Sequence, residues 1–246
     1  MKKITLLLIA SVMITGLVDA QVQLFLEEQS VDLPDGSLKG WVFPVINEME
    51  EARDDFDTYC KNRSDVKMKK ENGNLLIAEK ISIPSIATKR GDLIITSYMS
   101  EQNATMALVF RMGYDISLNS KMWPLEMENL HNYARAFMAY HYEQSYARRL
   151  EPMDKELEGL VKEKEKVEKD IQNIIDKIGN QEKKIGKETD AVKIETLEAE
   201  KSTLEADKRM LEDAMPPLVS KIDSHKSQVD RLRSESTAYQ SAIGAL

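Results

Sequence analysis

Residues 153–185 read MDKELEGLVKEKEKVEKDIQNIIDKIGNQEKKI, and residues 190–215 read DAVKIETLEAEKSTLEADKRMLEDAM. In the first stretch, apolar residues recur at multiples of seven positions in two interleaved series. The two series are Leu157, Ile171, Ile178 and Ile185, with Val192 beyond the stretch in the same phase, and Leu160, Val167 and Ile174. A heptad repeat of this kind is typical of helices that pack side by side along a narrow seam.

The phase of this repeat changes once, near Gly186. Beyond the change the apolar positions form two new series: Ile194, Met215, Ile222, Val229 and Ile243, and Leu197, Leu204, Leu211, Leu218, Leu232 and Tyr239. Gly186 is typical of the end of a helix, and Thr189 or Asp190 can cap the start of the next one. The pattern therefore predicts an antiparallel coiled-coil hairpin, with an outgoing helix at 122–186 and a returning helix at 190–245.

Three prolines fall within this helical pattern. An interior proline removes a backbone hydrogen bond and costs about 3 kcal/mol, so we expect Pro152 to kink or interrupt the outgoing helix. We expect Pro216 and Pro217 to break the returning helix near the same level. Polar residues also occupy seam positions, where they can fix register or partner; these are Lys164, Gln181, Lys201, Lys208 and His225.

The segment just before the heptads carries two apolar stripes. Pro124 suits the first turn of a helix, where its missing N–H costs little. The first stripe is Leu130, Tyr133, Phe137 and Tyr140, and the second is Ala139, Tyr146, Leu150 and Met153. The second stripe is in phase with the heptads. We therefore expect one helix to dock on the preceding domain with its first stripe and to continue into the hairpin with its second.

Residues 21–120 indicate a small α+β head. We expect a first strand at Val22–Leu26, a turn at Pro34-Asp35-Gly36, and a second strand over residues 41–45, where Pro44 requires a sheet edge or a strand end. The stripe that follows has the helical period; it is Val45, Met49, Ala52, Phe56 and Tyr59. It predicts a helix that packs across the sheet.

Further strands follow this helix. Asn72-Gly73 is a strong hairpin signal because both residues accept positive φ. We expect Leu75, Ile77, Ile81 and Ile83 on one face of the next strand, and Met106, Leu108, Phe110 and Met112 on one face of the last, with a loop at Ser100–Ala104. The predicted fold class is α+β: a small antiparallel sheet with a packed helix, followed by the helical hairpin over residues 121–246.

Residues 1–20 have the composition of a secretory signal peptide. Lys2 and Lys3 precede a short apolar run, Ile4–Val18, and small residues end at Ala20. We expect an exported protein, periplasmic or secreted, with no membrane span after cleavage; an uncleaved anchor is the alternative. Cys60 is the only cysteine, and we interpret it as a small buried residue, the alternative being a bridge between chains.

The chain is acidic, with a formal net charge of −8. Neither the head nor the hairpin carries the basic patch that nucleic-acid binding requires. The carboxylates between Glu48 and Asp57 are interpreted as a solvated helix face. None of the three histidines, His131, His141 and His225, stands at ligand spacing, and no HExxH, CxxC or G-x-S-x-G pattern occurs. We therefore predict no catalytic residue, no metal and no cofactor, and we do not expect an enzyme.

One stretch is chemically mixed enough to suggest a contact surface. Tyrosine and arginine are enriched at interface hot spots, so Tyr142, Tyr146, Arg148 and Arg149 are the candidate interaction residues. The alternative is that Tyr140 and Tyr146 pack inward while the two arginines are solvated.

The layout resembles that of uncharacterised exported proteins of Bacteroidota-type bacteria. The resemblance rests on Gly40-Trp41-Val42, Asn72-Gly73, Ile81-Ser82-Ile83-Pro84, Gly113-Tyr114-Asp115 and the coiled-coil tail. It covers most of the chain and implies no activity or site. A small body with helical arms is also similar to periplasmic Skp/OmpH-like chaperones, although here the arms are C-terminal, the charge is acidic and no strand follows the hairpin.

These observations favour a non-enzymatic envelope or periplasmic scaffold or interaction protein that acts through its head and its stalk. Its partners are expected to be proteins, and an oligomer is possible. Two alternatives stay open: a periplasmic holdase-type chaperone, and a head that binds a small ligand or a glycan.

Overall fold

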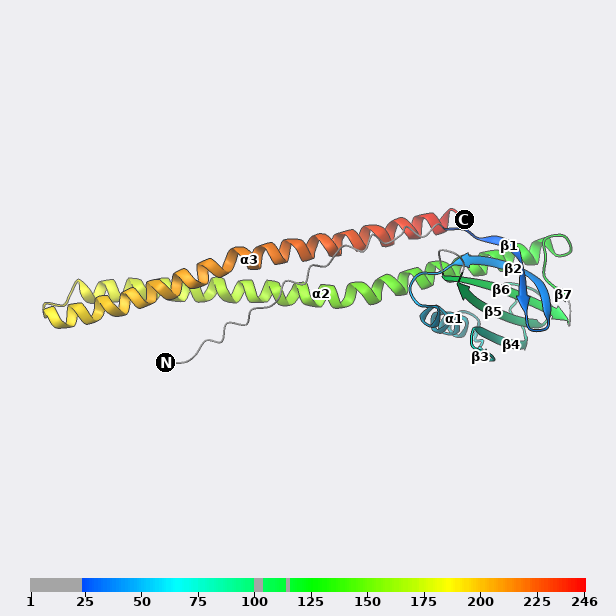
Figure 1. Ribbon diagram of the computed structural model, residues 1–246, viewed down its shortest axis with the longest axis horizontal. Coiled ribbons are helices and arrows are strands. Elements are labelled where there is room, and N and C mark those ends of the chain that lie inside the picture. Colours follow the sequence, from blue (N-terminus) through cyan, green and yellow to red (C-terminus); the bar gives the residue numbers. More distant parts are fainter. Residues whose placement is uncertain (1–23, 100–103, 114–115) are drawn as a thin grey trace.

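The computed structural model describes residues 24–99, 104–113 and 116–246, and it consists of a head and a long stalk (Figure 1). The predicted signal peptide and most of the predicted loop at 100–104 lie outside the described residues. The elements are β1 (Glu27–Leu33), β2 (Gly36–Pro44), α1 (Met49–Ser64), β3 (Lys69–Lys70), β4 (Leu75–Ile81), β5 (Gly91–Met99), β6 (Ala104–Gly113), β7 (Ile116–Ser117), α2 (Pro124–Ile185) and α3 (Ala191–Gly244).

The strands form one antiparallel sheet in the order β1-β2-β6-β5-β4-β3, and β7 pairs with the end of β6. Turn chemistry places the first two hairpins. Pro34 and Asp35 link β1 to β2, and Gly36 takes a φ of 134°, which a residue with a side chain would resist. Asn72 and Gly73 lie between β3 and β4. The predicted fold class, α+β with a helical hairpin, is confirmed.

α1 and the first part of α2 cover one face of the sheet and form the main core. Met106, Leu108 and Phe110 of β6 point into this core and are fully buried, as the alternation in the sequence predicted. The Phe137 ring of α2 lies edge-on to Phe56 of α1, at 4.9 Å between ring centroids. Each such buried aromatic side chain contributes about 1.5–3 kcal/mol to folding.

A second, smaller cluster lies on the other face of the sheet. It contains Leu75 and Ile77, whereas Ile83 belongs to the main core, so the single face predicted for these residues is wrong. The reason is an irregularity in β4. Lys80 takes a φ of 52°, and the register with β5 shifts between Ala78 and Ile81. One irregular step reverses the side-chain alternation of everything that follows it.

The first strand is also displaced from its predicted place. It was expected at Val22–Leu26, but residues 24–26 are outside the sheet and β1 covers Glu27–Leu33. Only Val31 of β1 is buried. An edge strand this polar carries little hydrophobic periodicity, so sequence reasoning selected the apolar residues just before it.

α2 and α3 pack antiparallel and form the stalk (Figure 1). Their bounds differ by at most two residues from the expected 122–186 and 190–245. Asp190 caps α3 by accepting hydrogen bonds from the N–H groups of Val192 and Lys193. The 62 residues of α2 make a rod about 90 Å long at 1.5 Å per residue.

The proline expectations were wrong in one respect, because neither helix is interrupted. α2 is continuous through Pro152, and α3 is continuous through Pro216 and Pro217. All three prolines are exposed on the outer surface of the stalk. A carbonyl that loses its partner there can bond to water, so the cost of each proline is reduced.

The heptad residues face the opposite helix along most of the stalk. Leu160, Val229 and Ile243 are buried and most of the other apolar heptad residues are half-buried, because two helices alone cover only part of a seam. Val192 is the exception. It is 73% exposed at the far end of the stalk, so its assignment to the seam was wrong.

Candidate functional site at the head–stalk junction

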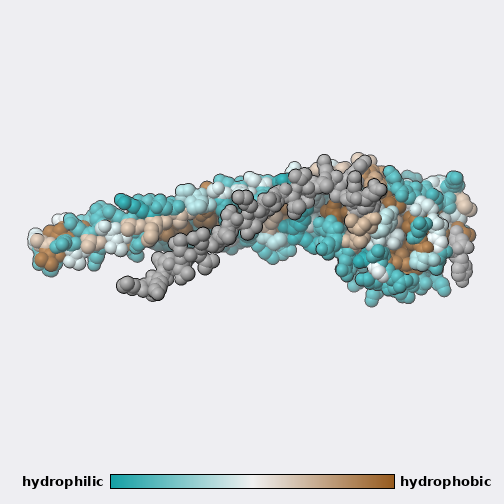
Figure 2. Space-filling model, in the orientation of Figure 1, coloured by the Kyte–Doolittle hydropathy of each residue, from teal (hydrophilic) through white to brown (hydrophobic). Residues whose placement is uncertain are grey.

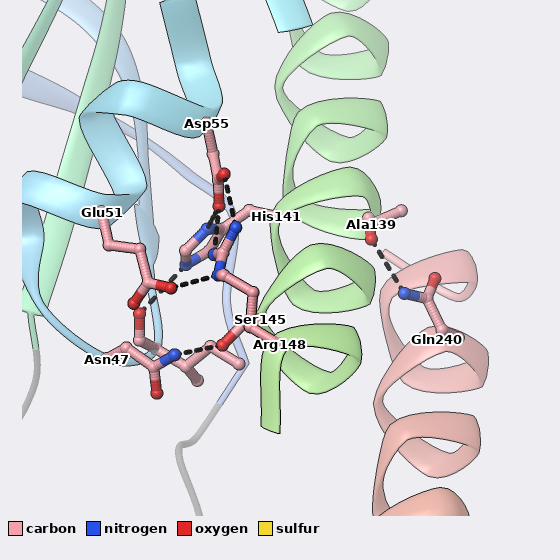
Figure 3. Close-up of polar contacts among 9 residues, drawn as sticks. Asn47, Glu51, Asp55, Ala139, His141, Ser145, Arg148 and Gln240 are labelled. Atoms are coloured by element: carbon pink, nitrogen blue, oxygen red, sulfur yellow. Dashed lines mark hydrogen bonds and ion pairs between the residues drawn. The ribbon is translucent and has the colours of Figure 1, made fainter. Parts of the chain in front are cut away.

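α1 and α2 meet in a group of polar side chains that we call the junction cluster (Figure 3). Its members are Asn47, Glu51, Asp55, His141, Ser145 and Arg148. Glu51 and Asp55 are one turn apart on α1, and the three residues of α2 follow at spacings of four and three, so each set lies on one helix face. Asn47, with a φ of 63°, precedes α1 and donates its side-chain N–H to the Ser145 hydroxyl.

Asp55 lies at the centre of the junction cluster and is only 7% exposed. Arg148 binds it with two parallel hydrogen bonds, Nη1 to Oδ1 at 2.9 Å and Nη2 to Oδ2 at 2.8 Å. Burial alone would raise the pKa of Asp55, but the hydrogen bonds from His141 and Arg148 and their positive charges outweigh it and hold the pKa below its ordinary value. Asp55 is therefore ionised at neutral pH.

His141 is fully buried, and each of its ring nitrogens faces an oxygen. Nδ1 lies 2.7 Å from Asp55 Oδ2, and Nε2 lies 3.0 Å from the backbone oxygen of Ile46. The ring therefore connects Asp55 of α1 with the segment that precedes this helix. The Arg148 Nε also contacts Glu51, so one guanidinium binds two carboxylates of α1.

The burial of Asp55 corrects one sequence interpretation. The carboxylates from Glu48 to Asp57 were taken as a solvated face, and Glu48, Glu50 and Asp54 are indeed exposed. Asp55 is not, because it lies beside Phe56 on the face of α1 that packs on α2. Its partners are 86 and 93 residues away in sequence, so local spacing held no sign of them.

The four predicted interaction residues do not form one exposed surface. Tyr142 is fully buried and Tyr146 is 4% exposed, and both rings pack against Tyr239 of α3. Arg149 lies over the Tyr146 ring, with its guanidinium carbon 5.4 Å from the ring centre. Arg148 binds Asp55. The tyrosines are therefore part of the packing between α2 and α3, which corrects the predicted contact surface.

The end of α3 completes the junction. Gln240 donates a hydrogen bond to the backbone oxygen of Ala139 at 2.8 Å, and Ile243 is 1% exposed within the main core (Figure 3). α3 therefore packs on α2 on the side opposite the junction cluster. Among the described residues, the hydroxyl of Tyr142, buried between these helices, has no hydrogen-bond partner, and burial raises the pKa of Tyr142.

Cys60 lies in the same core and agrees with its interpretation as a buried residue. The Tyr133 hydroxyl approaches its sulfur at 3.5 Å. Burial raises the pKa of the Cys60 thiol to about 12, so the thiol stays protonated and unreactive. A bridge to a second chain would require this core to open.

Farther along the stalk, polar groups cross between the helices. Gln181 donates to Glu200 at 2.5 Å, Lys201 pairs with Glu182 at 2.7 Å, and His225 lies 3.3 Å from Glu156. The other two polar seam residues, Lys164 and Lys208, pair within their own helices. The crossing groups specify one register, which apolar contacts alone would leave open.

The described residues contain no group of three or more histidine, cysteine, aspartate or glutamate side chains placed to hold a metal ion. In the same part of the chain, no helix is long and apolar enough to cross a membrane.

The fold defines the class of protein: an α+β head built onto a helical hairpin. No known protein family, curated protein or solved structure matches this chain. The resemblance to exported Bacteroidota-type proteins therefore stays a prediction.

Proposed function

We propose that this protein is an exported, non-enzymatic scaffold or interaction protein whose coiled-coil stalk holds the head at a fixed distance and in a fixed direction. The observation that carries the proposal is that one helix, α2, belongs to both parts. Its first turns bury Leu130 and Phe137 in the main core, and the same helix continues to Ile185 at the far end of the stalk.

The junction supports a rigid connection. A flexible linker would let the head rotate, whereas α2 enters the head as an unbroken helix and is bound to α1 through the buried Asp55–Arg148 pair. On its other side, Ile243 and Gln240 of α3 fix the returning helix to the same place. Such a molecule is suited to positioning two binding surfaces relative to each other.

The stalk itself offers places for contact. Its surface is largely hydrophilic, but hydrophobic surface appears at the end farthest from the head (Figure 2). Val192 lies there and is 73% exposed, and Met210, farther back along α3, is 58% exposed. Exposed apolar residues on a charged helix are candidates for partner contacts.

Chemical cross-linking in envelope extract, followed by mass spectrometry, tests the proposal. The test variant deletes one heptad from each helix, residues 171–177 and 204–210, which face each other across the stalk; this keeps the heptad phase and shortens the stalk by about 10 Å. We expect wild-type protein to cross-link to defined proteins through both ends, and the shortened variant to lose the cross-links at one end. A wild-type protein that cross-links to nothing would contradict the proposal.

A holdase-type chaperone is the second candidate, and the exposure of Val192 and Met210 on the stalk favours it. A holdase would suppress the aggregation of an unfolded outer-membrane protein at stoichiometric ratio. Val192→Asp with Met210→Asp would reduce that effect if the stalk binds the client. No suppression by wild-type protein would remove this candidate.

A further inference from the structure

The two edges of the sheet differ in how they are protected. At one edge, the two-residue strand β3 pairs with Leu76 and Ile77 of β4, and the positive φ of Lys80 distorts the β4 backbone beyond them. Bulges, short strands and charged side chains, lysine above all, are the usual devices that stop another chain from adding to a sheet. This edge is therefore closed to an incoming strand.

β1 forms the opposite edge, and its only protection of this kind is its carboxylates, which repel another acidic strand but not a cationic one (Figure 1). Glu27–Leu33 pairs with β2 over seven consecutive positions without a shift in register. The strand contains no proline, lysine or glycine. Among the described residues, β2 is the only segment that forms backbone hydrogen bonds with it.

The hydrogen-bond pattern shows which groups of β1 point outward. The Val45 N–H donates a hydrogen bond to the Ala104 oxygen. In an antiparallel pair every second residue forms backbone hydrogen bonds with the partner strand, so the odd-numbered residues of β2 bond to β6. The even-numbered residues of β2 therefore bond to β1, where their partners are odd-numbered. The backbone groups of Glu28, Ser30 and Asp32 are left to face away from the sheet.

The charge of this edge limits what can occupy it. Its sequence, EEQSVDL, holds three carboxylates and no cation. A second copy of the chain would bring the same carboxylates against each other, and like charges across paired strands are destabilising. A strand that carries lysine or arginine would instead meet opposite charge, and Glu27 and Asp32 are exposed to meet it.

Apolar surface lies next to the same edge. Glu28 accepts hydrogen bonds from the backbone N–H and the hydroxyl of Ser120, which brings the turn before α2 against the start of β1. In that turn and just after it, Met122 and Leu125 are 66% and 65% exposed. The apolar side chains of an added strand could cover them.

We propose that the outer edge of β1 binds an extended, cationic segment of a partner protein, which adds to the sheet as a further strand. The inference rests on the proposed function as an interaction protein and names the partner class of its head. Backbone hydrogen bonds to Glu28, Ser30 and Asp32 supply affinity, and the carboxylates supply selection for positive charge.

The test uses the full chain and two labelled peptides of about eight residues, one alternating lysine with valine and one alternating glutamate with valine. Fluorescence anisotropy should show binding of the lysine peptide only. Ser30→Pro removes an outward N–H without touching the backbone hydrogen bonds to β2; it also loses the hydroxyl hydrogen bond to Ser37, as Ser30→Ala does. The protein should therefore fold and bind at least about tenfold more weakly. Ser30→Ala keeps the N–H and should bind like wild type.

A second variant tests the inference independently of whether Ser30→Pro folds. Glu27→Lys with Asp32→Lys should reverse the preference, so that the glutamate peptide binds and the lysine peptide does not. Equal binding by Ser30→Pro and Ser30→Ala, or no binding of the lysine peptide to wild type, would overturn the inference. If the cross-links of wild-type protein in envelope extract persist in Ser30→Pro, the edge proposal alone fails; if wild type forms none, the proposed function fails as well.

Discussion

The two halves of α2 are built from one continuous helix and are held in place by different forces. Ten of its buried residues lie between Met127 and Tyr146, where the helix packs on the sheet, on α1 and on α3. Between Glu151 and Ile185 only Leu160 and Gln181 are buried. The first half is fixed by a three-sided core, and the second by a single seam with charge pairs. Substitutions in the first half of α2 should therefore lower the free energy of unfolding far more than substitutions in the second half.

The largest difference is expected from a large-to-small change in the core. Phe137→Ala should lower the free energy of unfolding by about 3–5 kcal/mol, because Phe137 is fully buried against Phe43 and Phe56. The matched change Ile174→Ala, at a half-buried seam position, should cost about 1–2 kcal/mol. Urea denaturation measures both, and equal losses would contradict the comparison.

A somewhat smaller effect is expected at the junction cluster. Asp55→Asn removes the buried negative charge that pairs with the Arg148 guanidinium and contacts the fully buried His141 ring. The loss should be about 3 kcal/mol. Asp54→Asn is the control, because Asp54 is exposed on the same helix and should change little. A loss shared by both variants would mean that the overall charge of α1, and not the cluster, matters.

Sequence reasoning found the seam but not this cluster, for a physical reason. A heptad repeat is a pattern within one continuous stretch of sequence, so residues 157–243 were enough to predict both helices and the turn between them. Asp55 depends on partners in another element, and a carboxylate next to Phe56 looks the same in sequence whether it is solvated or paired. Likewise, Lys80 reversed the alternation of β4 without any local signal, and Pro152 was tolerated because it faces outward.

The junction cluster should also make the stability of the protein depend on pH under acidic conditions. Because the pKa of Asp55 in the folded chain is below its ordinary value of 3.8, the unfolded chain takes up the proton first as the pH falls. The contribution of Asp55 to the free energy of unfolding is fully present above its ordinary pKa of 3.8, and it is lost as the pH falls through the lower pKa of the folded chain. Urea denaturation between about pH 5 and pH 2.5 should show a steeper loss for wild type than for Asp55→Asn. Parallel curves would contradict the assignment.

The smallest effect is expected in the outer stalk. Glu182→Gln removes the partner of Lys201, and both side chains are partly exposed. The melting temperature should fall only slightly, and the difference should disappear in about 1 M salt, where charges are screened within about 3 Å. A large fall in melting temperature that persists in salt would contradict this account, because it would mean that the outer stalk is tightly packed.

The central claim is that head and stalk form one rigid body, and a distance distribution tests it most directly. Spin labels at Lys61→Cys on α1 and Lys169→Cys on α2, both exposed positions, can be measured by double electron–electron resonance in a Cys60→Ala background. The structure predicts a single narrow distance in this protein and a broader distribution when Asp55→Asn is added. A broad or two-peaked distribution without Asp55→Asn would contradict the claim.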